Sequence, residues 1–321
     1  MSPALLGGPD RERLGGNRRG TVRAGTRAEH ESRGTQQLTL AVMSRLPLVV
    51  GAMVLGALLI VLASIAPGRL RGPSGAWALH RASRLLLRAL GVRRAQRTGP
   101  RSGASLVVAN DMSWLDVLVL SAAAPVLPVA NAEVAGWPLI GSLARRSGTI
   151  FINPRQLSGL PSDVERIATA MRRGHRVMVF PTVGSRSASA VSQFRTAPFQ
   201  SAVDAAVVVS PVVVTYRGSS GCSVTPGPPV DRAALVDSLI GILAHRRTAE
   251  VNWLPVIPAI VDGGHPAGDR ARAAAATQRA IARASQQRLT RHIPTPNTTG
   301  RPHRAQPVRV VDKPTEVAPA A

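Results

Sequence analysis

Short apolar runs alternate with longer amphipathic stretches through the middle of the chain. Apolar runs of strand length occupy residues 106–109, 126–130, 177–180 and 205–215. The last of these contains two runs that are separated at Ser210-Pro211. Residues 163–173 and 271–289 have the length and spacing of helices. This alternation predicts a single α/β domain over residues 102–289.

A long uncharged segment precedes this domain. Residues 46–66 contain no charged side chain, and at ~1.5 Å per residue a helix of that length spans the ~30 Å hydrocarbon layer. We therefore predict one transmembrane helix at residues 46–66. The alternative is a signal peptide, since Ser64-Ile65-Ala66 loosely resembles a small-residue cleavage site. For a signal peptide, however, the apolar core of this segment and the tail that precedes it are both too long.

The two ends of the chain lack a periodic apolar pattern. Residues 1–45 are rich in Gly, Arg and Thr, and residues 290–321 are rich in Pro. Such composition predicts disordered tails, because too little apolar surface is available to offset the entropy of ordering. The sequence does not decide whether the basic N-terminal tail has a role.

Positive charge is concentrated just after the uncharged segment. The net charge is +23, and residues 67–101 hold nine arginines and no acidic residue. Within them, residues 77–94 predict a basic amphipathic helix suited to anionic lipid, or else a surface helix that packs on its own domain. By the positive-inside rule this segment places the domain in the cytoplasm, with the chain crossing the cell membrane once.

Composition argues against two other classes of partner. Aromatic residues make up only 3% of the chain, so no stacking surface for nucleic acid is expected despite the positive charge. The single cysteine, Cys222, excludes an intramolecular disulfide and a cysteine-based zinc site, and the seven histidines lack metal-ligand spacing. We predict no metal.

Candidate chemistry lies where the first apolar run of the domain ends. The run stops at Asn110, and Asp111, Ser113 and Asp116 follow it before and within a predicted helix. The junction of a strand and a helix is a common place for reactive side chains in α/β proteins, because the start of the helix offers free N–H groups.

These residues resemble the first motif of the glycerolipid acyltransferases of the 1-acylglycerol-3-phosphate type, written N-H-x-x-x-x-D. Asn110, Ser113 and Asp116 match the motif, as do Trp114 and Leu115, whereas Asp111 stands where the family has histidine. The resemblance implies a mixed sheet flanked by helices.

Three later segments extend the resemblance over about 180 residues. Residues 148–152 (G-T-I-F-I) resemble the second motif, with Arg155 displaced by one position. Residues 179–187 (V-F-P-T-V-G-S-R-S) resemble the third motif, with one residue inserted and its glutamate missing. Residues 210–216 resemble the fourth.

The family resemblance implies transfer of a fatty acyl group from a thioester donor, acyl-CoA or acyl-carrier protein, to a lysophospholipid, without a cofactor. It implies catalytic roles for the first-motif residues Asp111 and Asp116. Residues implied in substrate binding are Asn110, Ser113, Arg155, Gly184, Ser185 and Arg186. Arginine suits an acceptor phosphate because its planar fork binds two oxygens at once. The alternative for Arg155 and Arg186 is that they are solvated loop residues.

Asp111 leaves three alternatives open. An aspartate is about 2.6 pKa units less basic than a histidine, or ~3.5 kcal/mol, so it is a poor base by itself. A carboxylate pair with Asp116 could share a proton and restore basicity. Asp111 could instead be a helix cap in a catalytically inactive relative that binds lipid or a partner enzyme. A different acceptor, such as an acylated amino-acid lipid, is a further alternative.

Overall fold

A computed structural model describes residues 43–65, 71–110, 113–153, 161–181, 194–218, 232–260 and 265–290. An N-terminal helix, Met43–Ser64, comes first. The strands are β1 (Val92–Gln96), β2 (Ser105–Ala109), β3 (Leu127–Asn131), β4 (Ile150–Ile152), β5 (Arg176–Val179), β6 (Val208–Gly218) and β7 (Arg247–Trp253). The other helices are α2 (Arg71–Ala89), α3 (Leu115–Ala123), α4 (Ala132–Ala135), α5 (Ile140–Arg146), α6 (Pro161–Arg172), α7 (Ala197–Asp204), α8 (Arg232–Ala244) and α9 (Pro266–Thr290).

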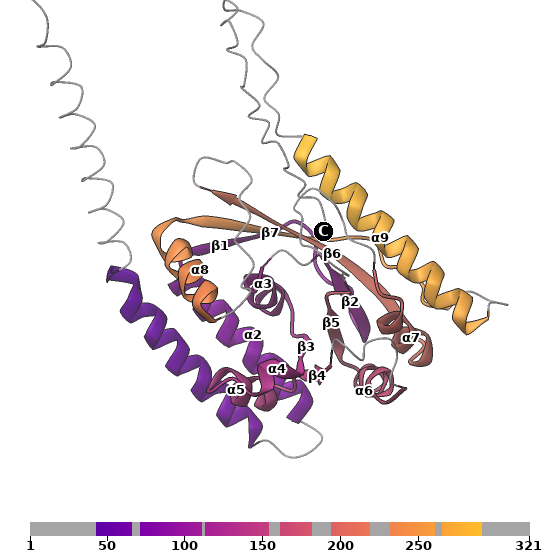
Figure 1. Ribbon diagram of the computed structural model, residues 1–321, viewed down its shortest axis with the longest axis horizontal. Helices are drawn as coiled ribbons and strands as arrows, with labels where there is room; N and C mark the ends of the chain where they lie inside the picture. Colours follow the sequence, from indigo (N-terminus) through magenta and orange to yellow (C-terminus); the bar gives the residue numbers. More distant parts are fainter. Residues whose placement is uncertain are drawn as a thin grey trace, which may run out of the picture.

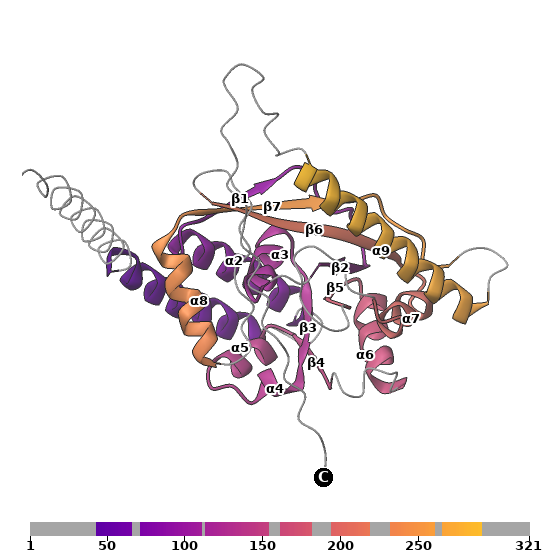
Figure 2. The same ribbon diagram turned by 45° about the horizontal axis from the view of Figure 1, so that its top comes forward.

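The seven strands form one mixed sheet, which confirms the predicted fold class. Their order is β1-β7-β6-β2-β5-β3-β4. Only the β6–β7 pair is antiparallel, while every other neighbouring pair is parallel. Helices α2 and α3 lie on one side of the sheet, and α6, α7 and α9 lie on the other (Figures 1 and 2).

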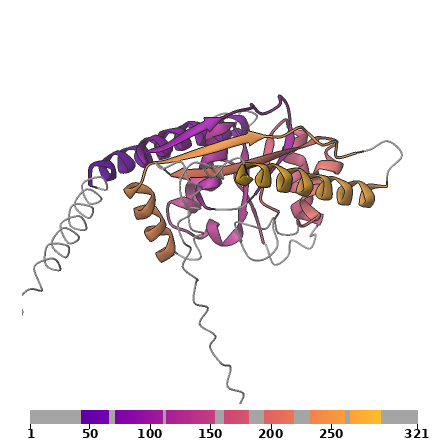
Figure 3. The same ribbon diagram turned by 90° about the horizontal axis from the view of Figure 1, so that it is seen from above.

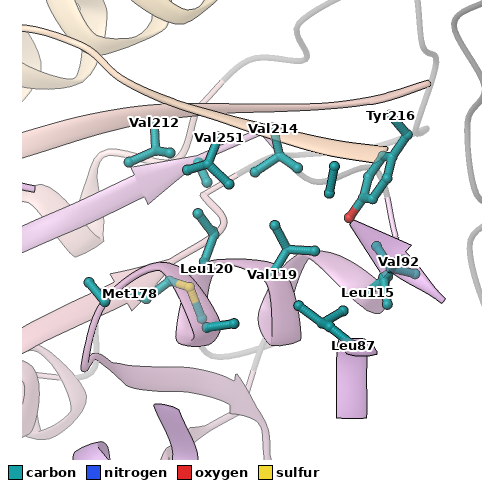
Figure 4. Packing of buried hydrophobic residues seen from close by; sticks show 14 of the residues in the cluster. Leu87, Val92, Leu115, Val119, Leu120, Met178, Val212, Val214, Tyr216 and Val251 are labelled. Atoms are coloured by element: carbon teal, nitrogen blue, oxygen red, sulfur yellow. The ribbon is translucent and has the colours of Figure 1, made fainter. Parts of the chain in front are cut away.

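Two hydrophobic cores fill the spaces between the sheet and these helix layers. Alternate residues of β2 belong to different cores: Val107 and Ala109 face α3, and Leu106 and Val108 face α7 and α9. Because both faces of β2 are buried, its sequence is an uninterrupted apolar run. Figure 4 shows the first core, in which side chains of α3 pack against those of β6 and β7.

Strand β6 corrects one prediction. The Ser210-Pro211 pair was expected to separate two runs, yet β6 continues through it. The carbonyl of Pro211 accepts a hydrogen bond from the N–H of Leu254 at 2.9 Å, so the backbone polar groups of Pro211 face the β7 side. Its missing N–H would have pointed the same way, and the pairing with β2 therefore loses no hydrogen bond.

The domain begins earlier than the predicted boundary at residue 102. Residues 92–96 were assigned to the juxtamembrane segment 67–101, but they form β1, the edge strand paired with β7. Helix α2, also in that segment, packs on α3, and His80 Nδ1–H donates to the carbonyl of Ser121 at 2.8 Å. The basic segment is thus part of the α/β body, as the second interpretation of residues 77–94 required.

The N-terminal helix lies antiparallel along α2 (Figures 1 and 3). Hydrogen bonds tie both of its ends to the body. At its first turn Arg45 Nη1 donates to the carbonyl of Leu243 at 2.8 Å. At its last turn Ser64 Oγ accepts from Arg146 Nη1 at 3.2 Å. In between, Gly56 lets the helix approach Ala82 so closely that a side chain at Gly56 would lie 3.0 Å from the Ala82 Cβ.

Candidate active site

The strands that carry the first three motif resemblances, β2, β4 and β5, end at the same edge of the sheet. In the parallel ladder Val108 of β2 is paired with Val179 of β5, so these two strands end side by side. Strand β3 lies beside β5, and β4 beside β3, with Ile152 paired with Asn131 at their ends. Ligands of α/β sheets bind at the carboxyl ends of parallel strands, so this edge is the expected place for a site.

Asp116 is completely buried at the start of α3. Its Oδ2 accepts the backbone N–H of Ser113 at 2.8 Å, and its Oδ1 accepts the hydroxyl of Tyr216 at 2.5 Å. A buried carboxylate requires such donors, because an uncompensated charge away from water is costly. Asp116 is therefore held in one orientation by the turn before α3 and by β6.

Tyr216 supplies the second donor from the far side of the first core. Its ring points from β6 toward the helix layer (Figure 4), and only 1% of the residue is exposed. Burial raises the pKa of the Tyr216 hydroxyl well above its usual value, and the charge of Asp116 and their hydrogen bond raise it further. The hydroxyl consequently stays protonated and donates a hydrogen bond to Asp116.

Asn110 is engaged with the backbone of β6. Its Nδ2 donates to the carbonyl of Val214 at 3.1 Å, and its Oδ1 accepts the N–H of Val214 at 2.9 Å. The backbone pairing of β2 with β6 ends one residue earlier, at Ala109 and Val212. The side-chain amide therefore continues the ladder and fixes the direction in which the chain leaves β2. Its predicted contact with substrate stays a prediction.

Ser113 and Trp114 complete the turn into α3. Ser113 is buried, its carbonyl accepts the N–H of Asp116 at 2.9 Å, and its Oγ accepts the N–H of Leu115 at 3.3 Å. The indole N–H of Trp114 donates to Ser238 Oγ at 3.0 Å and so connects the turn with α8. In this structure Ser113 positions Asp116, and its predicted role in substrate binding is not tested.

Five of the predicted site residues lie outside the described residues: Asp111, Arg155, Gly184, Ser185 and Arg186. Their described flanks are close to the site edge. Asn110 precedes Asp111, β4 precedes Arg155, and β5 precedes the segment of Gly184 to Arg186. On the far side of that segment, the N–H of Arg195 donates to the carbonyl of Pro181 at 2.8 Å, so the two ends of the segment are held together.

Sequence reasoning missed Tyr216 as a site residue. It appeared only as the last residue of the fourth motif match, with no role assigned to it. The available signal was that this is the single tyrosine of the chain, at the end of an apolar strand. A lone hydroxyl among buried apolar residues requires a polar partner, and Asp116 supplies it.

Comparison with known proteins gives the same family resemblance. Residues 92–215 match a family model described as Acyltransferase. A "1-acyl-sn-glycerol-3-phosphate acyltransferase" of Neisseria gonorrhoeae is 34% identical over 116 residues, which are 36% of this chain and 46% of that protein. A "Lyso-ornithine lipid O-acyltransferase" of Pseudomonas aeruginosa is 38% identical over 113 residues, 35% of this chain and 43% of that protein. The matched region thus spans a little less than half the length of these relatives.

A solved structure shares the fold. The crystal structure of the 1-acyl-sn-glycerophosphate (LPA) acyltransferase PlsC from Thermotoga maritima superposes with a TM-score of 0.55 at 15% identity. The match covers 80% of this chain and 98% of that one.

Proposed function

Because residues 92–215 match a family model described as Acyltransferase, we propose that this protein transfers a fatty acyl group from a thioester donor to a lysophospholipid such as 1-acylglycerol-3-phosphate. The observation that carries the proposal is the buried Asp116, held by Ser113 and Tyr216 beside the edge of the sheet where β2 and β5 end side by side. The family resemblance gives this aspartate its catalytic role, and the geometry provides the rigid placement such a role requires.

The lyso-ornithine lipid relatives favour a second acceptor. These relatives are named as O-acyltransferases, so the attacking group is again a hydroxyl that must lose its proton. Either acceptor requires a base close to the start of α3. We propose that Asp111 is this base, because the family resemblance puts the catalytic histidine at its position.

The structure constrains how the N-terminal helix attaches the protein to a membrane. It is apolar and long enough to cross a membrane, and more than half of each of the apolar residues Leu48, Val54 and Leu62 is exposed, which gives the helix an exposed apolar face. Its two ends are tied to the body, so a crossing would take the arginines of α2 into the hydrocarbon layer, which is costly. We propose that the helix lies in the membrane interface with this face in lipid, with the body on the cytoplasmic side.

The decisive experiment offers labelled acyl-CoA or acyl-carrier protein to the purified full-length protein in detergent, with lysophosphatidate or lyso-ornithine lipid as acceptor. Acylated product from one of the two acceptors supports the proposal and identifies the acceptor. The matched control is the Asp111→Asn variant, which keeps the size of the side chain and removes the base. Absence of product from the wild type with every donor and acceptor pair, in protein that is folded by thermal melting, refutes the proposal and leaves the inactive, lipid-binding relative.

A further inference from the structure

A pocket of about 780 Å³ lies between the first turn of the N-terminal helix, the second half of α2 and the start of β1. Six arginines from four parts of the chain line it: Arg45, Arg84, Arg88, Arg93, Arg94 and Arg246. None of the described residues that line it is acidic. The remaining lining is partly apolar and includes Leu48 of the N-terminal helix and Leu87 of α2. We refer to it as the arginine pocket.

Among the described residues, the arginines of this pocket have no acidic partner. In the part of the chain that the structure describes, the ion pairs involve Arg166, Arg172, Arg217 and Arg272, all elsewhere. Arg94 also lacks a hydrogen bond at one end of its guanidinium, because its Nη1 is buried with no hydrogen-bond partner among the described residues. Burial, and then the charges of Arg84 and Arg88, lower the pKa of Arg94. A buried donor left without a partner is destabilising unless a ligand supplies the acceptor.

Backbone geometry maintains the pocket. Gly91 has φ +74°, a conformation that favours glycine, and the absence of a side chain there lets the Arg45 guanidinium lie against the turn, 2.9 Å from where a Cβ would be. Arg45 is itself held by the Leu243 carbonyl. The turn between α2 and β1 therefore lets Arg45 lie close to the arginines of α2 and β1.

Several converging guanidinium groups recognise a multivalent oxyanion, and phosphate fits their planar forks. The pocket also opens beside Leu48, which is 62% exposed on the apolar face of the N-terminal helix. A ligand that fills both regions has an anionic head and an apolar tail. We propose that the arginine pocket binds the headgroup phosphate of an anionic membrane phospholipid, whose acyl chains lie along the exposed face of the N-terminal helix.

This site is separate from the Asp116–Tyr216 pair. Arg94 is paired with Ala249 of β7, and Ala249 is paired with Tyr216 of β6, so two strand spacings, or about 10 Å, separate Arg94 and Tyr216. The buried Ala249 lies between them. The inference therefore holds whether or not the protein transfers acyl groups.

The test uses full-length protein in a neutral detergent, titrated with dioleoyl phosphatidylglycerol and followed by thermal melting. A ligand that binds only the folded state raises the melting temperature until the site is saturated. We expect phosphatidylglycerol to stabilise the wild type, and phosphatidylcholine or inorganic phosphate at equal concentration to do so far less. An equal response to inorganic phosphate would overturn the lipid assignment in favour of a site for free phosphate.

Matched variants separate a pocket from diffuse attraction. Arg84→Gln/Arg88→Gln should weaken the apparent affinity for phosphatidylglycerol roughly 30-fold, the effect of two arginines at an anionic lipid surface. Arg279→Gln/Arg283→Gln removes the same charge with the same spacing from the exposed face of α9 and should change it by less than about twofold. Equal losses in both would overturn the proposal.

Two further variants keep the test interpretable. Arg84→Lys/Arg88→Lys preserves the charge and should still lose affinity severalfold, because lysine lacks the planar fork. Arg94→Met, which removes the unpartnered buried group, should fold without lipid and lose its response to phosphatidylglycerol; a retained response overturns the proposal. The Asp111→Asn protein should respond as the wild type does, which separates this site from the proposed acyl transfer.

Discussion

Replacing Tyr216 with phenylalanine tests the pair that positions Asp116. The change keeps the ring that packs between β6 and α3 and removes only the hydroxyl that donates to Asp116 at 2.5 Å. A hydrogen bond to a charged group contributes about 1.5–3 kcal/mol, and the carboxylate left behind is fully buried. We therefore expect a loss of about 2 kcal/mol, or about 4–8 °C in melting temperature for a domain of this size.

Titration of the same hydroxyl gives an independent measurement. The pKa of Tyr216 is raised in the folded state, so the stability it contributes is present below its unfolded pKa of about 10 and is lost as the pH rises above that value. Above about pH 10 the free energy of unfolding of the wild type should therefore fall, and this part of the pH dependence should be absent from Tyr216→Phe. Because the chain has one tyrosine, the near-ultraviolet absorbance of tyrosinate reports on this residue alone.

A double-mutant cycle with Asp116→Asn assigns the effect to the pair. The two single changes should each destabilise the protein, and the double change should cost less than their sum, because both remove the same interaction. Tyrosinate that forms in the folded wild type near pH 10, together with an unchanged melting temperature in Tyr216→Phe, would refute the reasoning.

Three other changes give distinct outcomes. Asp111→His should raise acyl transfer by up to ~10²-fold if only the base is weak, measured with labelled donor, and no gain would place the defect beyond that position. Gly56→Leu should destabilise the folded protein by about 1–3 kcal/mol, because it forces the N-terminal helix from α2, whereas Gly51→Leu, with nothing within 4 Å of a side chain there, should not. Asn110→Ala should lower thermal stability by about 1–3 kcal/mol, because the N–H and carbonyl of Val214 lose their partners; unchanged melting would show that water replaces the amide.

The parts of the fold that could be predicted are those whose burial is uniform. Strand β2 is buried on both faces, so its apolar run marked it clearly, and the polar residues after it marked the turn into α3. Strand β1 was missed because V-R-R-A-Q contains charged residues that an edge strand tolerates. Strand β7 lies inside the sheet, but charged and polar residues interrupt the apolar pattern of R-T-A-E-V-N-W, and Glu250 is compensated there by Arg217 of β6.

The site was predictable only in its local part. Asn110, Ser113 and Asp116 are close in sequence, and one motif identifies them. The contact between Asp116 and Tyr216 joins residues 100 positions apart, and the arginine pocket gathers side chains from four separate parts of the chain. Periodicity describes one element at a time, so neither grouping could be derived from it.

The attachment of the N-terminal helix at both ends has a consequence for how the protein is made. This helix is synthesised before the α/β body, yet Arg45 donates to Leu243, 198 residues later in the chain. Its surface on α2 becomes available soon after the helix itself, whereas the contact at its first turn requires α8, which is translated after six of the seven strands. Throughout elongation the exposed apolar face needs cover from lipid or a chaperone, because chains with such surfaces aggregate. Delivery of the ribosome to a membrane before α8 is translated would therefore increase the yield of folded protein.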